Sequence, residues 1–136
     1  MNNKLVIYTD GGARGNPGPS AIGVVIYGNG EHPVKKLSQY IGEGTNNQAE
    51  YKALIAGLTE ALNMDVNEVV CNLDSELVVR QIQGRYKVKE PGLKNLIMEV
   101  IRLANKFARV EFNHVPREKN KLADKLVNDA LDKAGF

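Results

Sequence analysis

The chain has 136 residues, 43% of them hydrophobic and 25% charged, and a formal net charge of +2 at pH 7. This length and composition are typical of one soluble globular domain, and so small a net charge neither demands nor excludes a nucleic-acid partner. A single cysteine, Cys71, excludes an internal disulfide. The sequence contains no apolar run of about 18 residues, so no membrane span is expected. The start of the chain lacks the apolar core of a signal peptide. We therefore expect one cytoplasmic domain over residues 1–136 that does not bind membranes.

The first third of the chain predicts a meander of three strands. Residues 4–10, 20–28 and 34–42 are apolar or alternating and are separated by glycine-rich turns. Gly23, inside the second strand, marks either a bulge or a close approach of another segment. From Asn47 to Asn63 the apolar residues change to helical spacing.

Two further strands and three helices are predicted in the remaining chain. A fourth strand covers Asn67 to Asp74, a short helix follows Ser75, and a longer helix runs from Pro91 to about Ala108. VEFNHV (110–115) predicts a fifth strand, and the last helix runs from about residue 119 to 133. The order βββαβααβα predicts an α/β fold with a five-stranded mixed sheet, whose later strands are added in parallel through helical crossovers.

Four carboxylates are placed so that one edge of this sheet would bring them together. Asp10 ends the first strand and Asp74 ends the fourth, so both emerge at one edge if these strands are parallel neighbours. Glu50 lies in the first turn of its helix on the apolar face, and Asp124 lies early in the last helix beside apolar residues. Each acid also has an ordinary explanation, as a turn residue, a helix cap, a partner of the helix dipole or a solvated side chain.

A joint role explains the four positions better than four separate ones. Carboxylates so close together repel one another unless a divalent cation neutralises them, and oxygen ligands without cysteine suit Mg²⁺ or Mn²⁺. Two such ions about 4 Å apart can activate a water and stabilise a leaving oxygen in phosphodiester hydrolysis. The pattern therefore predicts a hydrolytic metal site.

The segment GGARGNPG (11–18) joins the first two strands. It has neither the Gly-Lys-Ser/Thr of a phosphate-binding P-loop nor the spacing of a dinucleotide-binding loop. Its small residues let another backbone approach, so Arg14 and Asn16 are candidates for contact with phosphate or ribose. A flexible connector is the alternative.

Four segments of the chain resemble the signature segments of type 1 ribonuclease H. These are YTDGGARGNPGP, TNNQAEY, LDSELVV and VPREKNKLAD, in the family's order and spread over nearly the whole chain. The resemblance implies a ribonuclease H-like fold and an endoribonuclease that hydrolyses the RNA strand of RNA–DNA hybrids, leaving 5′-phosphate and 3′-hydroxyl ends. It implies two-metal-ion catalysis with Mg²⁺, or Mn²⁺ as an alternative, and two ions when substrate is bound.

The resemblance also implies roles for single residues. The acids that match the family's metal-binding catalytic residues are Asp10, Glu50, Asp74 and Asp124. Gly11 and Asn16 match positions that approach the RNA strand, and Thr45 is either a phosphate contact or simply the helix cap. The loop that matches the one in the minor groove, where the 2′-hydroxyl distinguishes RNA from DNA, contains Asn46, Asn47 and Gln48.

The chain departs in two places from the best-known bacterial pattern and resembles the short form found in archaea and some bacteria. A tryptophan- and lysine-rich protrusion is replaced by GRYKVKEPG, in which Lys87 and Lys89 are weak substitutes as substrate contacts. The loop before the last acid is shortened to PREKN, because VEFNHV places His114 in a strand. We therefore expect Arg117, rather than His114, to handle the scissile or departing phosphate. A surface ion pair with Glu118 or Asp124 is the alternative for Arg117.

Two other functions stay open at this point. A non-catalytic hybrid- or RNA-binding module would share the fold, although the presence of all four acids argues against it. A different nuclease, such as a junction resolvase or an exonuclease, would share the sheet, although the TNN-x-x-E segment and Asn16 argue against that. An RNA–DNA hybrid is the expected partner of a monomeric protein, and double-stranded RNA is left open as a second substrate.

Overall fold

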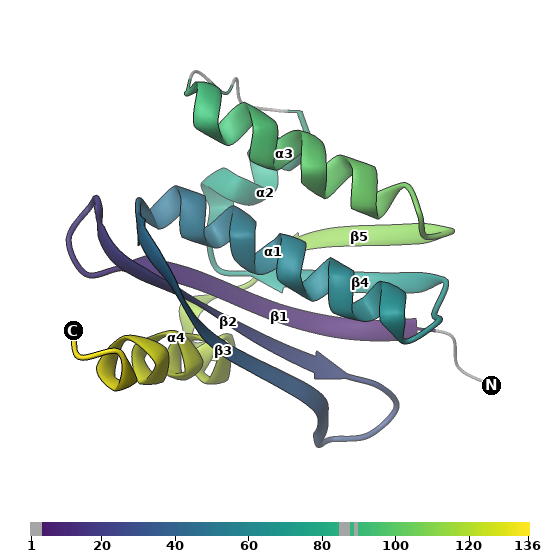
Figure 1. Ribbon diagram of the computed structural model, residues 1–136. Helices are drawn as coiled ribbons and strands as arrows, with labels where there is room; N and C mark the ends of the chain where they lie inside the picture. Colours follow the sequence, from purple (N-terminus) through teal and green to yellow (C-terminus); the bar gives the residue numbers. More distant parts are fainter. Residues whose placement is uncertain (1–3, 85–87, 89) are drawn as a thin grey trace.

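The computed structural model describes residues 4–84, 88 and 90–136 (Figure 1). Its elements follow the predicted order, with one added 3₁₀ turn at Arg117–Lys119. The strands are β1 (Lys4–Ala13), β2 (Gly18–Tyr27), β3 (Pro33–Gly44), β4 (Glu68–Leu73) and β5 (Arg109–His114). The helices are α1 (Asn46–Asn63), α2 (Glu76–Ile82), α3 (Pro91–Ala104) and α4 (Lys121–Lys133). Within these described ranges, no helix is both long and apolar enough to cross a membrane.

The strands form one mixed sheet in the order β3-β2-β1-β4-β5. β1 and β3 each pair antiparallel with β2, whereas β1 pairs parallel with β4, and β4 with β5. The chain passes from β3 to β4 through α1, and from β4 to β5 through α2 and α3. The predicted five-stranded mixed sheet is therefore confirmed, with β1 and β4 as parallel neighbours.

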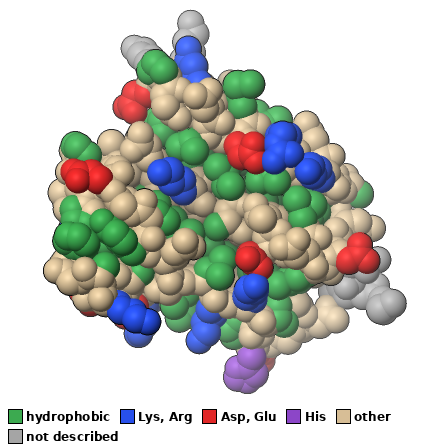
Figure 2. All heavy atoms as spheres, in the orientation of Figure 1, with side chains coloured by type: hydrophobic (Ala, Val, Ile, Leu, Met, Phe, Trp, Pro, Cys, Tyr) green, Lys and Arg blue, Asp and Glu red, His purple; other side chains and the backbone are tan. Residues whose placement is uncertain are grey.

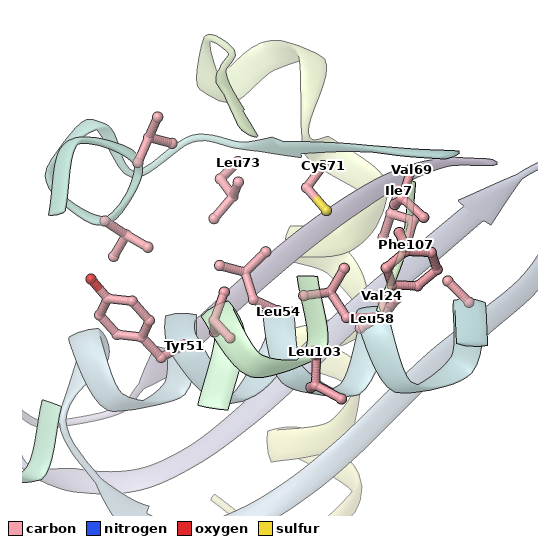
Figure 3. Close-up of a cluster of buried hydrophobic side chains, with 14 of the residues drawn as sticks. Ile7, Val24, Tyr51, Leu54, Leu58, Val69, Cys71, Leu73, Leu103 and Phe107 are labelled. Carbon is pink, nitrogen blue, oxygen red and sulfur yellow. The ribbon is translucent and has the colours of Figure 1, made fainter. Parts of the chain in front are cut away.

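Helices cover both faces of the sheet and bury two apolar clusters. On one face, Leu54 and Leu58 of α1 pack with Ile7 and the buried Cys71 of the sheet, and α2 and α3 extend this cluster (Figure 3). On the other face, α4 packs its small apolar residues over β2 and forms a smaller cluster. The larger core holds α1 firmly, and the smaller one leaves α4 with less apolar contact.

The two largest errors in the predicted boundaries are at the ends of β1 and α3. β1 runs beyond Asp10 to Ala13, because its last residues pair with β2 across a short hairpin. α3 ends at Ala104, since the backbone N–H groups of Lys106 and Phe107 bond back three residues in tight turns. Ile101 of this helix is 44% exposed.

Candidate active site

The carboxyl edge of β1 and β4 brings three of the predicted acids together. The pairing of β1 with β4 stops at Thr9 and Leu73, so Asp10 and Asp74 emerge next to each other. Asp10 does not end its strand, as the sequence predicted, but it follows the last parallel pair. Glu50 reaches the same point from the second turn of α1, not the first. The three carboxylates offer ligand oxygens that all lie within 4.8 Å of one another.

Asp124 lies beside this cluster rather than within it. It is in the first turn of α4 and lines a cavity of about 600 Å³ together with Asp10, Glu50 and Asp74. Its charge is close enough to raise the pKa of Asp10. The structure therefore places all four acids around one cavity, three in a tight group and the fourth on an adjacent helix.

Two glycines allow the helices that carry Glu50 and Asp124 to approach β1 and β2. A Cβ on Gly11 would lie 2.2 Å from the backbone carbonyl of Ala49, so only glycine lets α1 come so near. The Gly11 N–H then donates a hydrogen bond of 2.7 Å to Oε1 of Glu50. On the other face, a Cβ on Gly23 would lie 2.1 Å from the Ala123 carbonyl oxygen. Gly23 therefore marks a close approach, not a bulge, since the register shifts of β2 lie elsewhere.

The electrostatics of the cluster fit a divalent cation. Burial raises the pKa of Asp10 from 3.8 to about 6, opposed by a hydrogen bond with Glu50 and assisted by the charges of Asp74 and Asp124. Burial, followed by the interaction with Asp10, raises the pKa of Glu50 well above 4.5. Oε2 of Glu50 is buried without a hydrogen-bond partner. A carboxylate with an unpaired buried oxygen, grouped with two other carboxylates, is a donor set suited to Mg²⁺ or Mn²⁺.

Asp10→Asn should raise the free energy of unfolding by on the order of 2 kcal/mol at pH 8 in a chelator. The folded state raises the pKa of Asp10, so ionising this carboxyl costs stability as pH rises from 3.8 to about 6. The full loss of stability from ionising Asp10 applies above pH 6. It is absent below pH 4, where the Asp10 carboxyl is protonated in both the folded and the unfolded state. Urea denaturation at pH 8 and at about pH 3.5 measures the difference, which should disappear at the lower pH. A variant that is less stable than the parent at pH 8 would contradict this electrostatic account.

The loop between β1 and β2 is bonded to the N-terminus of α1. The backbone N–H of Asn46 donates to Oδ1 of Asn16 at 3.0 Å, and the Ala13 N–H donates to Oδ1 of Asn46 at 2.8 Å. Asn46 and the half-buried Asn47 line the cavity, whereas Asn16 is exposed at its border. The glycine-rich segment is therefore no free connector but a loop held against α1.

Thr45 caps α1. Its hydroxyl oxygen accepts from the Gln48 N–H at 3.1 Å, and the Gln48 side chain accepts from the Thr45 N–H at 2.9 Å. This reciprocal pair is a capping box. The cap interpretation of Thr45 is therefore correct, and Oε1 of Gln48 is occupied by the same cap.

The two arginines at the cavity differ in their surroundings. Arg14, which the sequence offered to phosphate or ribose, has its guanidinium bonded to side chains of α4. Arg117 is exposed, lines the cavity, and forms no ion pair with Glu118 or Asp124 within the described residues. The described residues therefore do not show the ion-pair alternative for Arg117, whose side chain lines the cavity.

The remaining predicted residues lie off the cavity or outside the described chain. His114 is the exposed last residue of β5, as the strand assignment required, and does not line the cavity. Lys87 and Lys89 lie outside the described residues. On the face shown in Figure 2, lysine and arginine side chains are interspersed with acidic ones and form no extended basic surface.

Asn120 is a residue that sequence reasoning missed. It is 1% exposed, and its Nδ2 donates a hydrogen bond of 2.9 Å to the carbonyl oxygen of Thr9, next to Asp10. Its position at the N-cap of α4 was readable from the sequence, but its side chain makes no cap hydrogen bond. It instead joins the start of α4 to β1, which brings Asp124 near Asp10.

Comparison with known proteins places this arrangement in a family. Residues 8–130 match the family model described as reverse transcriptase-like. The chain is 47% identical over 133 residues to the bifunctional protein Rv2228c of Mycobacterium tuberculosis, a match that covers 96% of this chain and 36% of that protein. It is 40% identical over 127 residues to ribonuclease HI of Halobacterium salinarum, covering 93% of this chain and 64% of the relative. The chain thus spans only part of the length of these two relatives.

A solved structure matches over its full extent. LC11-RNase H1, isolated from compost by a metagenomic approach, has been solved in complex with an RNA/DNA hybrid. That structure superposes with a TM-score of 0.89 at 51% identity, covering 96% of this chain and 98% of the other. The sheet order, the four acids around one cavity and these matches agree with the resemblance seen in the motifs, and they show that the chain belongs to the ribonuclease H family.

Proposed function

We propose that the chain is an endoribonuclease that hydrolyses the RNA strand of RNA–DNA hybrids. The observation that carries the proposal is the group of Asp10, Glu50 and Asp74 within 4.8 Å, with one oxygen of Glu50 buried and unpartnered. The hybrid bound to LC11-RNase H1, which is 51% identical, supports the substrate class. Hydrolysis would break the bond from phosphorus to the 3′ oxygen and leave 5′-phosphate and 3′-hydroxyl ends.

The four acids are proposed to hold Mg²⁺, with Mn²⁺ as an alternative, and two ions when substrate is present. When bound, such ions activate the attacking water and stabilise the departing oxygen. The chain itself fixes the donors: Asp10 on β1, Asp74 directly after the neighbouring parallel strand β4, and Glu50 on a helix packed against Gly11. Because burial and mutual repulsion raise the pKa of Asp10 and Glu50, these two carboxyl groups are poised to exchange protons for a cation.

Recognition of the RNA strand is proposed to involve the cavity border formed by the β1–β2 loop and the start of α1. Asn46 and Asn47 line the cavity, and Asn16 is held beside them by its bond to the Asn46 N–H. Amide groups suit contacts with the 2′-hydroxyl and base edges of a minor groove. The N-terminus of α1 also favours a phosphate, and the capping box of Thr45 and Gln48 keeps that turn in place.

Cleavage of a labelled RNA–DNA hybrid tests the proposed function. The chain should cut the RNA strand at several internal positions in Mg²⁺ and should be inactive in EDTA, and the downstream products should carry 5′-phosphates. Double-stranded DNA should stay intact, and a double-stranded RNA arm tests that second substrate. A chain that binds the hybrid without cutting it would be a binding module, and cleavage of the DNA strand would indicate a different nuclease.

A further inference from the structure

Arg14, which directly follows β1, is bonded to the C-terminal half of α4. Its Nη1 donates to Oδ1 of Asp132 at 2.7 Å and to the carbonyl oxygen of Phe136, and its Nη2 donates to Oδ1 of Asn128 at 3.2 Å. Figure 1 shows this end of α4 next to the β1–β2 loop. One guanidinium therefore bonds to three residues of the same segment.

Two of these partners, Asn128 and Asp132, continue the line of positions on α4 that begins with Asp124. Residues 124, 128 and 132 are spaced by four, and such positions share one face of a helix. Phe136 lies beyond the end of α4 and contributes only its backbone carbonyl. Asn128, the first partner, also donates from Nδ2 to the carbonyl oxygen of Asp124 at 3.1 Å. A rotation of α4 that moved Asp124 away from Asp10 would carry Asn128 and Asp132 away from Arg14.

Asp124 depends on such an anchor more than the other three acids do. Asp10 lies on β1 and Asp74 directly follows β4, while Glu50 is buried on a helix packed against the larger core. α4 instead packs through a smaller apolar cluster, and the Ser38 hydroxyl of β3 donates a hydrogen bond to its Leu126 carbonyl oxygen. Its N-terminus is anchored by the bond from Asn120 to Thr9, which leaves the rotation of the C-terminal half to other contacts.

We propose that Arg14 is a positioning residue that orients α4, and with it the carboxylate of Asp124, toward Asp10, and that it does not contact a substrate phosphate. The proposal rests on the proposed hydrolysis of hybrids. The Arg14 and Asp132 side chains are 36% and 66% exposed, and exposed ion pairs contribute little to stability. The contact therefore matters through the geometry of the site and not through the stability of the fold.

Steady-state cleavage of a hybrid by Arg14→Ala gives the first test. This variant should lower kcat by about 5- to 20-fold with KM changed by less than about 2-fold, since small displacements of reacting groups act on the chemical step. Arg14→Lys should recover part of the lost kcat, because an ammonium group can pair with Asp132 but cannot bond to Asp132 and Asn128 through two nitrogens at once. Asp132→Ala should lower kcat in the same direction by less. The matched control is Asp129→Ala, which breaks a 2.7 Å pair with Lys125 inside α4 and should leave kcat unchanged.

A double-mutant comparison and a salt series separate positioning from direct contact. In an Asp124→Asn background, Arg14→Ala should have no further effect on kcat, because its effect acts through that carboxylate. An equal loss in both backgrounds would overturn the proposal. The proposal would also be overturned if Arg14→Ala raised KM without changing kcat and lowered the salt dependence of hybrid binding. That dependence is the slope of log K against log salt concentration in Ca²⁺, and a decrease of about 0.9 is the signature of a lost phosphate contact.

A measurement without substrate keeps this proposal separate from the proposed function. If the parent chain does not cleave a hybrid, the proposed function fails. The contact between Arg14 and α4 is then tested by amide hydrogen exchange. Arg14→Ala should accelerate exchange in α4 and leave it unchanged in α1. Unchanged exchange in α4 would overturn the role of Arg14.

Discussion

Asp10→Asn and Asp74→Asn should each lower kcat for hybrid cleavage by about 1,000-fold or more, since metal ions contribute several kcal/mol to such reactions. Each change removes one ligand carboxylate from the cluster with Glu50. The fold should survive, because asparagine keeps the shape of aspartate and relieves the repulsion of neighbouring charges. Single-turnover cleavage of a labelled hybrid at saturating Mg²⁺ measures the effect without interference from product release.

Asp129→Asn is a suitable control for this experiment. Asp129 is an exposed acid on α4, the helix that carries Asp124, and it pairs with Lys125. The control should cleave at the parental rate, and calorimetry should show weaker Mg²⁺ binding only for the two cluster variants. Near-normal cleavage by either cluster variant at saturating Mg²⁺ would refute the metal site.

Arg117→Ala should lower kcat about 10- to 100-fold, the scale of one lost charge-assisted contact in a transition state. The guanidinium lies at the cavity, free of Glu118 and Asp124, and is thus available to a phosphate. Arg117→Lys should keep part of the activity, because lysine retains the charge but not the fork. The measurement is kcat and KM on the same hybrid over a range of Mg²⁺ concentrations.

His114→Ala is the comparison for Arg117. His114 pairs in register with Leu73, whose side chain is buried in the larger core, whereas the next residue, Asp74, lines the cavity. The change should therefore alter kcat by less than about 2-fold, as for a surface position remote from the reacting groups. A larger loss of kcat for His114→Ala than for Arg117→Ala would contradict the proposal that Arg117, rather than His114, contacts the departing phosphate.

Local patterns account for most of the elements and for the choice of the acids. The helical spacing around Leu54 and Leu58, the cap at Ser75 and the opening of α3 at Pro91 each depend on neighbours within a few residues. The order of elements predicted that the later strands are parallel, and Asp10 and Asp74 were expected to meet if β1 and β4 are parallel neighbours, as the structure shows them to be. Short-range physics was sufficient there, because periodicity, capping and crossover rules act within one or two elements.

The sequence by itself determined the element order, the mixed sheet and the four acids that face one cavity. Only the tertiary structure decided that β1 continues past Asp10, that Gly11 and Gly23 admit two helices, and that Asp124 lies beside the tight group. It also decided that Arg14 bonds to α4, across 118 residues in the case of Asp132, and that Asn120 bonds to Thr9 across 111. The raised pKa values of Asp10 and Glu50 belong to the same class, because burial produces them and burial exists only once the chain is packed. No local pattern encodes contacts between such distant residues, since each depends on how whole elements stack.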